Sequence, residues 1–185
     1  DMRFVESAAR EVGSVLRAGN LCVLESTSPP YSTRMVEKIV SEVSGLAPEQ
    51  FMTAHCPERI IPGRMLIELR ENDRIIGSNR PESAQFAKEI YEKVVTGGTI
   101  RLTDDLTAEM CKLTENTFRD INIAYANELS KVCDRLGIDV FKLIELANCH
   151  PRVNVHSPGV GVGGHCIAVD PWFIHEKFED ITPLI

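Results

Sequence analysis

The sequence predicts an α/β fold in which a partial doubly wound parallel sheet is followed by an α-helical central domain. Over residues 1–103, short apolar runs typical of strands alternate with amphipathic segments typical of helices. Such alternation favours a parallel sheet with helical crossovers. Residues 104–136 contain no proline or glycine, which predicts one long helix. We therefore predict two domains, over 1–103 and 104–185.

The elements of the first domain follow from hydrophobic spacing and from turn residues. Residues 2–18 repeat apolar side chains at three- and four-residue steps, and Gly19 is a natural end for that helix. Residues 21–27 (LCVLEST) form a short apolar run that the Ser-Pro-Pro segment ends. The remaining predictions are a helix over 32–43, a strand over 51–55, a loop over 56–64, a short helix over 64–70, a strand over 73–78, a helix from Pro81 to about 94 and a strand over 99–103.

The second domain is predicted to be helical. The long helix is expected to stop at Gly137, and a second helix follows over 139–148. Long helices of this kind often pair, so we expect a homodimer that forms through the long helix.

Composition excludes several classes of protein. A net charge of −7 over 185 residues argues against a general nucleic-acid-binding protein, which needs a basic face. Apolar runs are only a few residues long, so no membrane span is predicted. Six cysteines without a disulfide-like spacing favour reduced thiols and a cytoplasmic location. Three cysteines adjoin histidines, but no zinc-ligand spacing occurs, so we predict no metal site.

A glycine-rich run over 159–164 (GVGVGG) leads into Cys166. Four glycines in six positions weaken regular structure, which indicates an unusual backbone path or a loop close to a ligand. Cys166 is a candidate nucleophile, and the alternative is an inert buried thiol. Because a free thiol has a pKa of about 8.5, an active Cys166 needs a nearby cation.

Polar residues of the long helix form a second candidate group. Lys112 and Asn116 lie four residues apart and share a face with Glu109 and Asp120. This face is either a solvated polar surface or the place where an amine and a carboxamide hold an oxyanion. Lys112 would supply the cation for Cys166 if the fold brings them together. Asp170, four residues after Cys166, can bind a water or orient a base.

A dinucleotide-binding half-sheet normally carries G-x-G-x-x-G after its first strand. None follows the strand over 21–27, and the nearest glycine clusters are Gly97-Gly98 and the run over 159–164. The residues alone therefore predict a doubly wound half-sheet, a helical domain and a cysteine beside a glycine-rich loop.

Six blocks in order give a specific resemblance: LESTSPP, HCPERIIPG, ENDRIIGS, AEMCKLTENTFRDINIAYANEL, HPRVN and PGVGVGGHCIAVDPWF. Over nearly the whole chain they resemble the UDP-glucose/GDP-mannose dehydrogenase family. The resemblance implies that residues 1–103 are the C-terminal half of a Rossmann-like NAD-binding domain and residues 104–185 a helical dimerisation domain. It also implies NAD-dependent, two-step oxidation of a sugar C6 alcohol in surface polysaccharide synthesis.

The same resemblance assigns the chemical roles. Cys166 would attack the C6 aldehyde, giving a thiohemiacetal and then a thioester that water hydrolyses. Lys112 and Asn116 would stabilise the oxyanions and contact the substrate, and Asp170 would position the water or assist proton transfer.

Three further residues are assigned by resemblance alone. Thr27 would hold water near the reacting centre, on the cofactor side. Glu58 is similar to a substrate-side glutamate, and Arg152 resembles an arginine that reaches the sugar of the partner subunit.

Two positions bear on the choice of sugar. UDP-glucose-specific members carry a second glutamate where this chain has Pro62, and a lysine where it has Val169. The resemblance therefore implies UDP-N-acetylmannosamine as the substrate, with UDP-N-acetylglucosamine and UDP-glucose as alternatives.

Family members extend beyond this sequence at both ends, with a glycine fingerprint before it and a nucleotide-covering domain after it. We therefore expect this piece alone to be inactive, and its alternative description is a folded dimerisation core. A cysteine hydrolase or acyltransferase with His165 as base is a third alternative. It is disfavoured because adjacent residues rarely form a nucleophile–base pair.

Overall fold

The computed structural model describes residues 1–61, 63–164 and 166–185. Pro62, on which part of the substrate prediction depends, and His165, the base of the hydrolase alternative, lie outside the described residues. The chain divides into two compact units, Asp1–Lys112 and Leu113–Ile185, and the long helix contributes to both. The assignment of residues 1–103 to nucleotide binding and of residues 104–185 to dimerisation stays a prediction.

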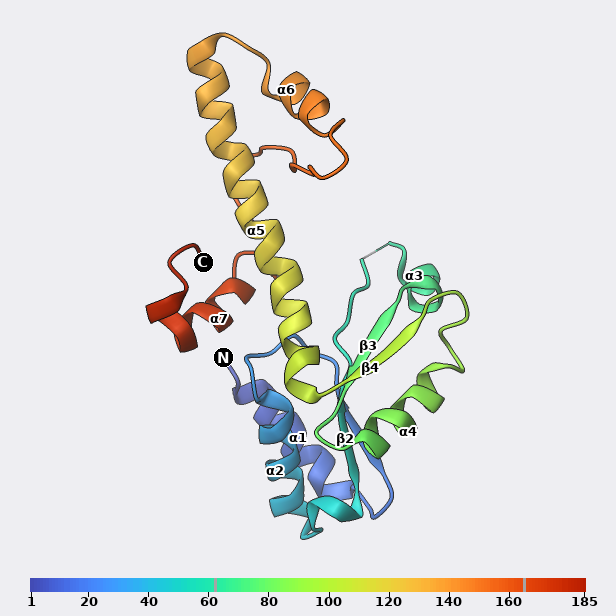
Figure 1. Cartoon of the computed structure of the whole chain (residues 1–185). Coiled ribbons are helices and arrows are strands. Elements are labelled where there is room, and N and C mark those ends of the chain that lie inside the picture. The colour runs from blue at the N-terminus through green and yellow to red at the C-terminus, as the bar shows by residue number, and fades with distance from the viewer. Residues whose placement is uncertain (62, 165) are drawn as a thin grey trace. The chain divides into compact units, whose positions relative to one another are not determined.

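The predicted strands and helices of the first unit are present with small shifts of their ends (Figure 1). The helix that begins at Pro81 ends at Tyr91, a few residues earlier than expected. In chain order the elements are α1 (Arg3–Val15), β1 (Leu21–Leu24), α2 (Ser32–Ser44), η1 (Pro48–Gln50), β2 (Met52–His55), α3 (Met65–Glu71), β3 (Arg74–Gly77), α4 (Pro81–Tyr91), β4 (Ile100–Thr103) and the long α5 (Asp105–Leu136).

The four strands form one sheet in the order β1-β2-β3-β4. β1 pairs with β2 in parallel, with Leu21 opposite Met52, and β3 pairs with β4 in parallel. The α/β class is confirmed, but β2 and β3 are antiparallel at His55 and Gly77, so the sheet is mixed and the all-parallel prediction needs correction. The connection through α3 stays at one end of the strands, so the chain returns in the opposite direction (Figure 1).

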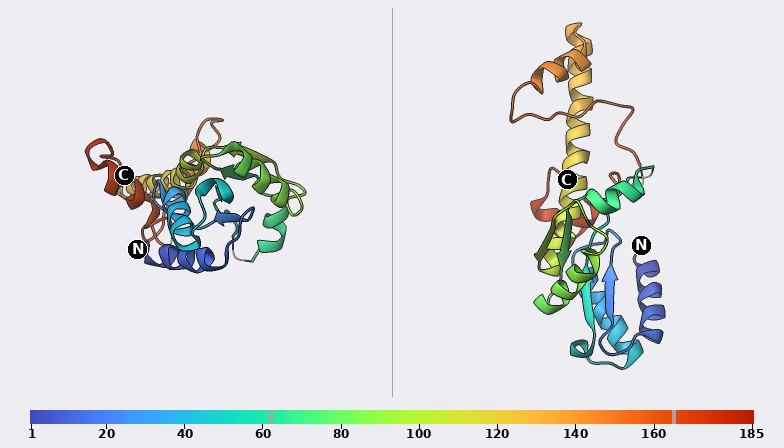
Figure 2. Two further views of the ribbon diagram at one scale, coloured as in Figure 1. Left: turned by 90° about the horizontal axis from the view of Figure 1, so that it is seen from below. Right: turned by 90° about the vertical axis from the view of Figure 1, so that its right-hand side faces the viewer.

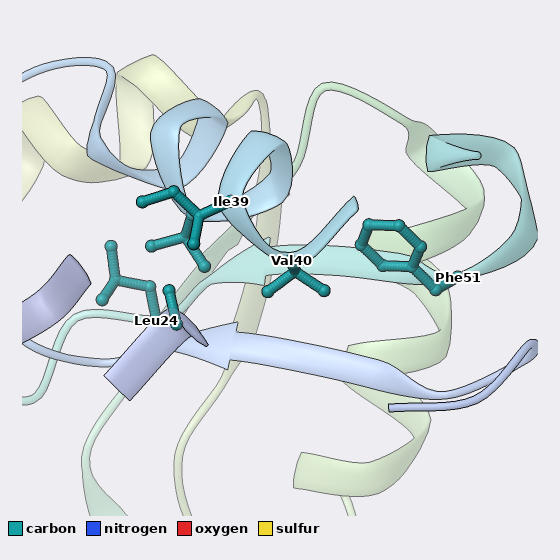
Figure 3. Close-up of a cluster of buried hydrophobic side chains, with 6 residues drawn as sticks. Leu24, Ile39, Val40 and Phe51 are labelled. Carbon is teal, nitrogen blue, oxygen red and sulfur yellow. The ribbon is translucent and has the colours of Figure 1, made fainter. Parts of the chain in front are cut away.

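Helices cover both faces of this sheet, as a doubly wound arrangement requires. Figure 2 shows α4 on the opposite side of the strands from α1 and α2. Side chains of β1 alternate between the two faces, because Leu24 packs toward α1 and α2 whereas Val23 packs toward α4. The first core contains Ala9, Leu24, Val36, Ile39, Val40 and Phe51 (Figure 3), and the second Ala54, Cys56, Ile76, Ala84 and Ala87.

The second unit is built on the remainder of α5. The helix ends before Gly137, whose φ of +70° is strained for residues with a side chain, so the predicted stop is confirmed. Asp139 caps the next helix, α6 (Val140–Ala147), by accepting the backbone N–H of Phe141 at 2.8 Å. α6 packs on α5 through Ala126, Cys133, Val140 and Ile144.

A helix that the sequence did not predict follows the glycine-rich run. α7 (Asp170–Phe178) begins with an aspartate and has Pro171 in its first turn, a combination suited to a helix start, and the short η2 (Glu179–Ile181) follows it. Across the described residues, no helix combines the length and apolar character needed to cross a membrane.

Candidate functional site

A buried contact joins two of the predicted site residues. Asn116 on α5 donates its Nδ2–H to Oδ2 of Asp170, the first residue of α7, at 2.5 Å. The two residues are 3% and 5% exposed. A short hydrogen bond to a carboxylate in such a place is strong and fixes the direction of both side chains. Asn116 therefore orients Asp170.

Cys166 belongs to the turn that leads into α7. Its carbonyl oxygen accepts the backbone N–H of Val169 at 3.0 Å and of Asp170 at 2.9 Å. The cysteine itself is exposed, which excludes the inert buried thiol as its description. The turn ties the position of Cys166 to that of Asp170.

The glycine-rich run before Cys166 has the unusual backbone that its composition indicates. Gly161 and Gly164 have φ values of +148° and +99°. The N–H of Gly159 donates to Oδ1 of Asn127 on α5 at 2.8 Å. No described atom lies within 4 Å of a Cβ added at any of the four glycines, so their approach to a ligand stays a prediction.

The polar face of α5 is only partly solvated. Glu109 is 1% exposed and Asn116 is 3% exposed, so the solvated-surface interpretation is wrong for these two residues. Lys112 and Asp120 are half-buried, and burial raises the pKa of the Asp120 carboxyl.

Glu109 has a structural role that its spacing did not reveal. Its carboxylate accepts the N–H of Tyr31 at 2.6 Å, and the N–H and hydroxyl of Thr33 at 2.7 and 2.6 Å. It thus caps the N-terminus of α2 from another helix. Burial raises its pKa, and the donors of Thr33 and Tyr31 offset part of that effect.

Thr27 and Glu58 follow the carboxyl ends of β1 and β2 in the first unit. Thr27 is half-buried in the loop that connects β1 to α2. Oε2 of Glu58 pairs with Nη1 of Arg74 at 3.2 Å, and Arg74 is itself 3% exposed. Sequence reasoning missed Arg74, although a charged residue that opens an apolar strand was a usable signal.

Arg152 lies on the exposed turn after α6, where its N–H donates to Nδ1 of His150 at 3.3 Å. α6 packs around Ala126 and Cys133, farther along α5 than Asn116. The structure does not bring Arg152 to the Asn116–Asp170 pair.

Apart from Arg152, the predicted site residues fall into two sets. Cys166, Asn116 and Asp170 are held together in the second unit, whereas Thr27, Glu58 and Lys112 belong to the first. Convergence of the two sets stays a prediction. In the described part of the chain, no three His, Cys, Asp or Glu side chains gather as a metal site would require.

The loop after β1 is unsuited to holding a pyrophosphate. Pro29 and Pro30 lack N–H groups, and the N–H groups of Tyr31 and Thr33 already bond to Glu109. The N-terminus of α2 therefore has no free donors to offer at these positions, although such termini commonly bind phosphate. Thr27 lies in the same loop, after the end of β1 at Leu24, and its place on the cofactor side stays a prediction.

Comparison with known proteins identifies both parts of the chain. Residues 1–95 match the UDP-glucose/GDP-mannose dehydrogenase family, NAD binding domain, and residues 106–183 match its central domain. NAD is therefore the cofactor of the domain to which the first part belongs.

Several relatives are similar over almost all of the chain. An NDP-N-acetyl-D-galactosaminuronic acid dehydrogenase of Ralstonia solanacearum is 53% identical over 100% of the chain and 45% of its own length. The UDP-N-acetyl-D-mannosamine dehydrogenase of Escherichia coli K12 is 52% identical over 94% of the chain and 43% of its own length.

A solved structure agrees with these matches. The UDP-D-ManNAc dehydrogenase of Pyrococcus horikoshii superposes with a TM-score of 0.95 at 44% identity, over 100% of this chain and 44% of that one. The chain therefore spans a little under half the length of the relatives it matches.

Proposed function

Because this chain belongs to the UDP-glucose/GDP-mannose dehydrogenase family, we propose that the whole protein oxidises C6 of UDP-N-acetyl-D-mannosamine to a carboxylate with NAD. The observation that carries the proposal is the buried Asn116–Asp170 contact beside the Cys166 turn. The second unit thus contains the exposed thiol of Cys166, the oriented carboxamide of Asn116 and the oriented carboxylate of Asp170. The similarity to enzymes named for N-acetylated sugars supports an N-acetylated sugar nucleotide as the substrate.

Cys166 is the proposed nucleophile. Once the C6 alcohol has lost a hydride and a proton, the thiolate adds to the aldehyde and forms a thiohemiacetal. Loss of a second hydride and proton leaves a thioester. Water then cleaves the C–S bond, releasing the carboxylate and restoring the thiol. NAD supplies the oxidising equivalents for both hydride losses.

Neighbouring side chains are proposed to manage charge and water. Asn116 uses one amide hydrogen on Asp170, and its second can point at an oxyanion, together with the ammonium of Lys112. Asp170, fixed by Asn116, orients the hydrolytic water, and Thr27 helps to hold it. Glu58 and Arg152 are proposed on the substrate side, with Arg152 acting on the sugar of the partner subunit.

A second copy of the protein is the proposed macromolecular partner. Phe118, Tyr125 and Val132 of α5 are 55%, 52% and 50% exposed, and their seven-residue spacing forms one apolar stripe. An exposed stripe of this kind on a long helix favours pairing with another helix. Residues 1–103 and 104–185 are proposed as the functional nucleotide-binding and dimerisation parts.

The proposed setting is the cytoplasm and surface polysaccharide synthesis. All six cysteines are free thiols in the structure, which is typical of proteins from reducing compartments. A uronate sugar nucleotide is a donor suited to polysaccharide assembly, as the resemblance implies.

A substrate panel tests the proposal. The whole protein should reduce two equivalents of NAD for each molecule of UDP-N-acetylmannosamine, and should act more slowly on the N-acetylglucosamine, N-acetylgalactosamine and glucose analogues. Preference for one of those analogues would reassign the sugar, and inactivity with all four would reject the enzyme class.

Replacement of the nucleophile tests the mechanism. Cys166→Ser should abolish formation of the uronate, because a serine hydroxyl stays protonated near neutral pH and is then a poor nucleophile, and because its ester resists hydrolysis more than a thioester does. Cys149→Ser, at another exposed cysteine, is the matched control and should keep normal turnover. Uronate formation at the normal rate by Cys166→Ser would remove this residue from the mechanism.

A further inference from the structure

The segment over 56–61 leaves β2 and carries Glu58, whose carboxylate has three donors around it. Oε1 accepts the N–H of Arg59 at 2.6 Å and of Ile60 at 2.8 Å. Oε2 faces Nη1 of Arg74 at 3.2 Å. The direction of this carboxylate is therefore set by its own backbone and by one guanidinium.

Arg74 is an unusual partner because it is almost fully buried. The guanidinium lies over the ring of Tyr91, 5.7 Å from its centroid, and beside the thiol of Cys56. Its Nε and Nη2 atoms have no hydrogen-bond partner among the residues that the structure describes. Glu58 is the carboxylate that compensates this buried charge. A buried charge that loses its partner is costly, so the pair is strongly coupled.

Independent contacts hold the segment elsewhere. The N–H of Ile61 donates to Oε2 of Glu68 on α3 at 2.8 Å, and Nη1 of Arg59 donates to the carbonyl of Asp73 at 3.2 Å. Loss of the Arg74 contact should therefore release the Glu58 carboxylate without detaching the whole segment.

We propose that Arg74 is a positioning residue: it fixes the Glu58 carboxylate, and through it the backbone over 58–60, in the orientation that meets the nucleotide sugar. The identity of that ligand rests on the proposed function. Arg74 does not touch the ligand, because its side chain is buried behind Glu58. Glu58 then acts as a fixed hydrogen-bond acceptor for the sugar.

Amide hydrogen exchange on the 185-residue chain tests the positioning without cofactor or substrate. Arg74→Met should speed exchange at the amides of Arg59 and Ile60 by about tenfold, because the carboxylate that accepts them loses its anchor. The amide of Ile61, which bonds to Glu68, should change little. Arg70→Met, at an exposed arginine of the same unit, is the matched control.

Two further variants complete the exchange test. Arg74→Lys keeps a positive charge opposite Glu58 and should restore part of the protection. Should Arg74→Met not fold, Arg74→Gln removes the charge while keeping a polar group, and it should show the same acceleration. Wild-type exchange at Arg59 and Ile60 in Arg74→Met, or in Arg74→Gln if that variant is needed, would overturn the proposal.

Kinetics on the whole protein separate positioning from mere stabilisation. Arg74→Met should raise KM for the UDP-sugar by about tenfold, with KM for NAD changed by less than about twofold. A fall in apparent kcat with both KM values unchanged would indicate only a smaller folded fraction, and would overturn the substrate-side role. An inactive wild type would reject the proposed function but leave the exchange result intact.

Discussion

His55, the last residue of β2, places an imidazole in the core of the first unit. The side chain is 1% exposed, and neither ring nitrogen is hydrogen-bonded within the described part of the chain. Burial lowers its pKa to about 4, and the nearby Leu24 carbonyl and Asp105 carboxylate offset this only in part. Between pH 6.5 and about pH 4, His55 is therefore neutral in the folded chain and protonated in the unfolded chain.

Stability should consequently fall as the pH drops from about 6.5 toward 4, because only the unfolded chain takes up this proton over that range. Between pH 7.5 and pH 5 the expected loss is about 2 kcal/mol. Urea denaturation at the two pH values measures it. His55→Phe should remove this dependence, whereas His150→Gln, at an exposed histidine, should retain it.

The raised pKa of Glu109 acts in the opposite direction, since the folded chain then binds its proton more readily than the unfolded chain. That contribution is common to the wild type and His55→Phe, so it cancels in the comparison. Equal pH dependence in these two proteins would refute the lowered pKa of His55.

Tyr31 holds the one left-handed backbone among the described non-glycine residues, with φ of +77°. Glu109 accepts its N–H, and Arg34 lies over its ring at 5.5 Å. Tyr31→Gly and Tyr31→Ala both remove the ring, but only alanine keeps a Cβ. The glycine variant should be more stable than the alanine variant by about 1 kcal/mol in urea denaturation. Equal stabilities would mean that the left-handed conformation carries no strain.

The sequence was enough to predict which residues belong to the candidate site, but not which of them contact each other. Helical spacing placed Lys112 and Asn116 on one face, the glycine-rich run and residue spacing indicated Cys166 and Asp170, and the resemblance gave these residues their roles. The Asn116–Asp170 bond joins residues 54 positions apart, which no local pattern encodes. Nothing in the Pro-Pro-Tyr sequence signals that Tyr31 adopts a left-handed backbone.

At the scale of whole elements, hydrophobic spacing predicted each strand and most helices because burial of one face decides where they form. The direction of β3 was not predictable, since it depends on where the short α3 returns the chain. α7 was missed because glycines and Pro171 resemble a loop, although proline suits a first helical turn.

The apolar stripe of α5 gives the dimer proposal a direct test. Tyr125→Asp places a charge in the middle of the Phe118–Tyr125–Val132 stripe and should weaken self-association by about a hundredfold, because the charge would be desolvated in the interface. Sedimentation equilibrium measures the change. Ala124→Asp adds the same charge at an exposed position off the stripe and should leave the dimer intact. A dimer equally strong in both variants would place the interface elsewhere.

At the scale of the whole chain, β1 stands at one end of the strand order of the described sheet. Among the described residues no strand pairs with its outer edge. An apolar groove of about 530 Å³ lies beside it, lined by residues that include Val12, Leu21, Val23 and Ile90.

The loop after β1 bears on whether the 185-residue chain binds NAD by itself. Pro29 and Pro30 have no N–H groups, and Glu109 already accepts the N–H groups of Tyr31 and Thr33. These positions therefore offer no backbone donors to a pyrophosphate. We therefore expect no saturable NAD binding in calorimetry, and no NADH from UDP-N-acetylmannosamine.

The proposed self-association uses α5 and not that loop, so the same sample should still dimerise and show helical circular dichroism, which controls for folding. The Escherichia coli relative, 52% identical over 94% of the chain, is a suitable positive control for the assay. NADH production by the isolated chain would show that backbone donors at these positions are dispensable. The nucleotide would then have to bind through contacts other than the N-terminus of α2, whose N–H groups at Tyr31 and Thr33 bond to Glu109.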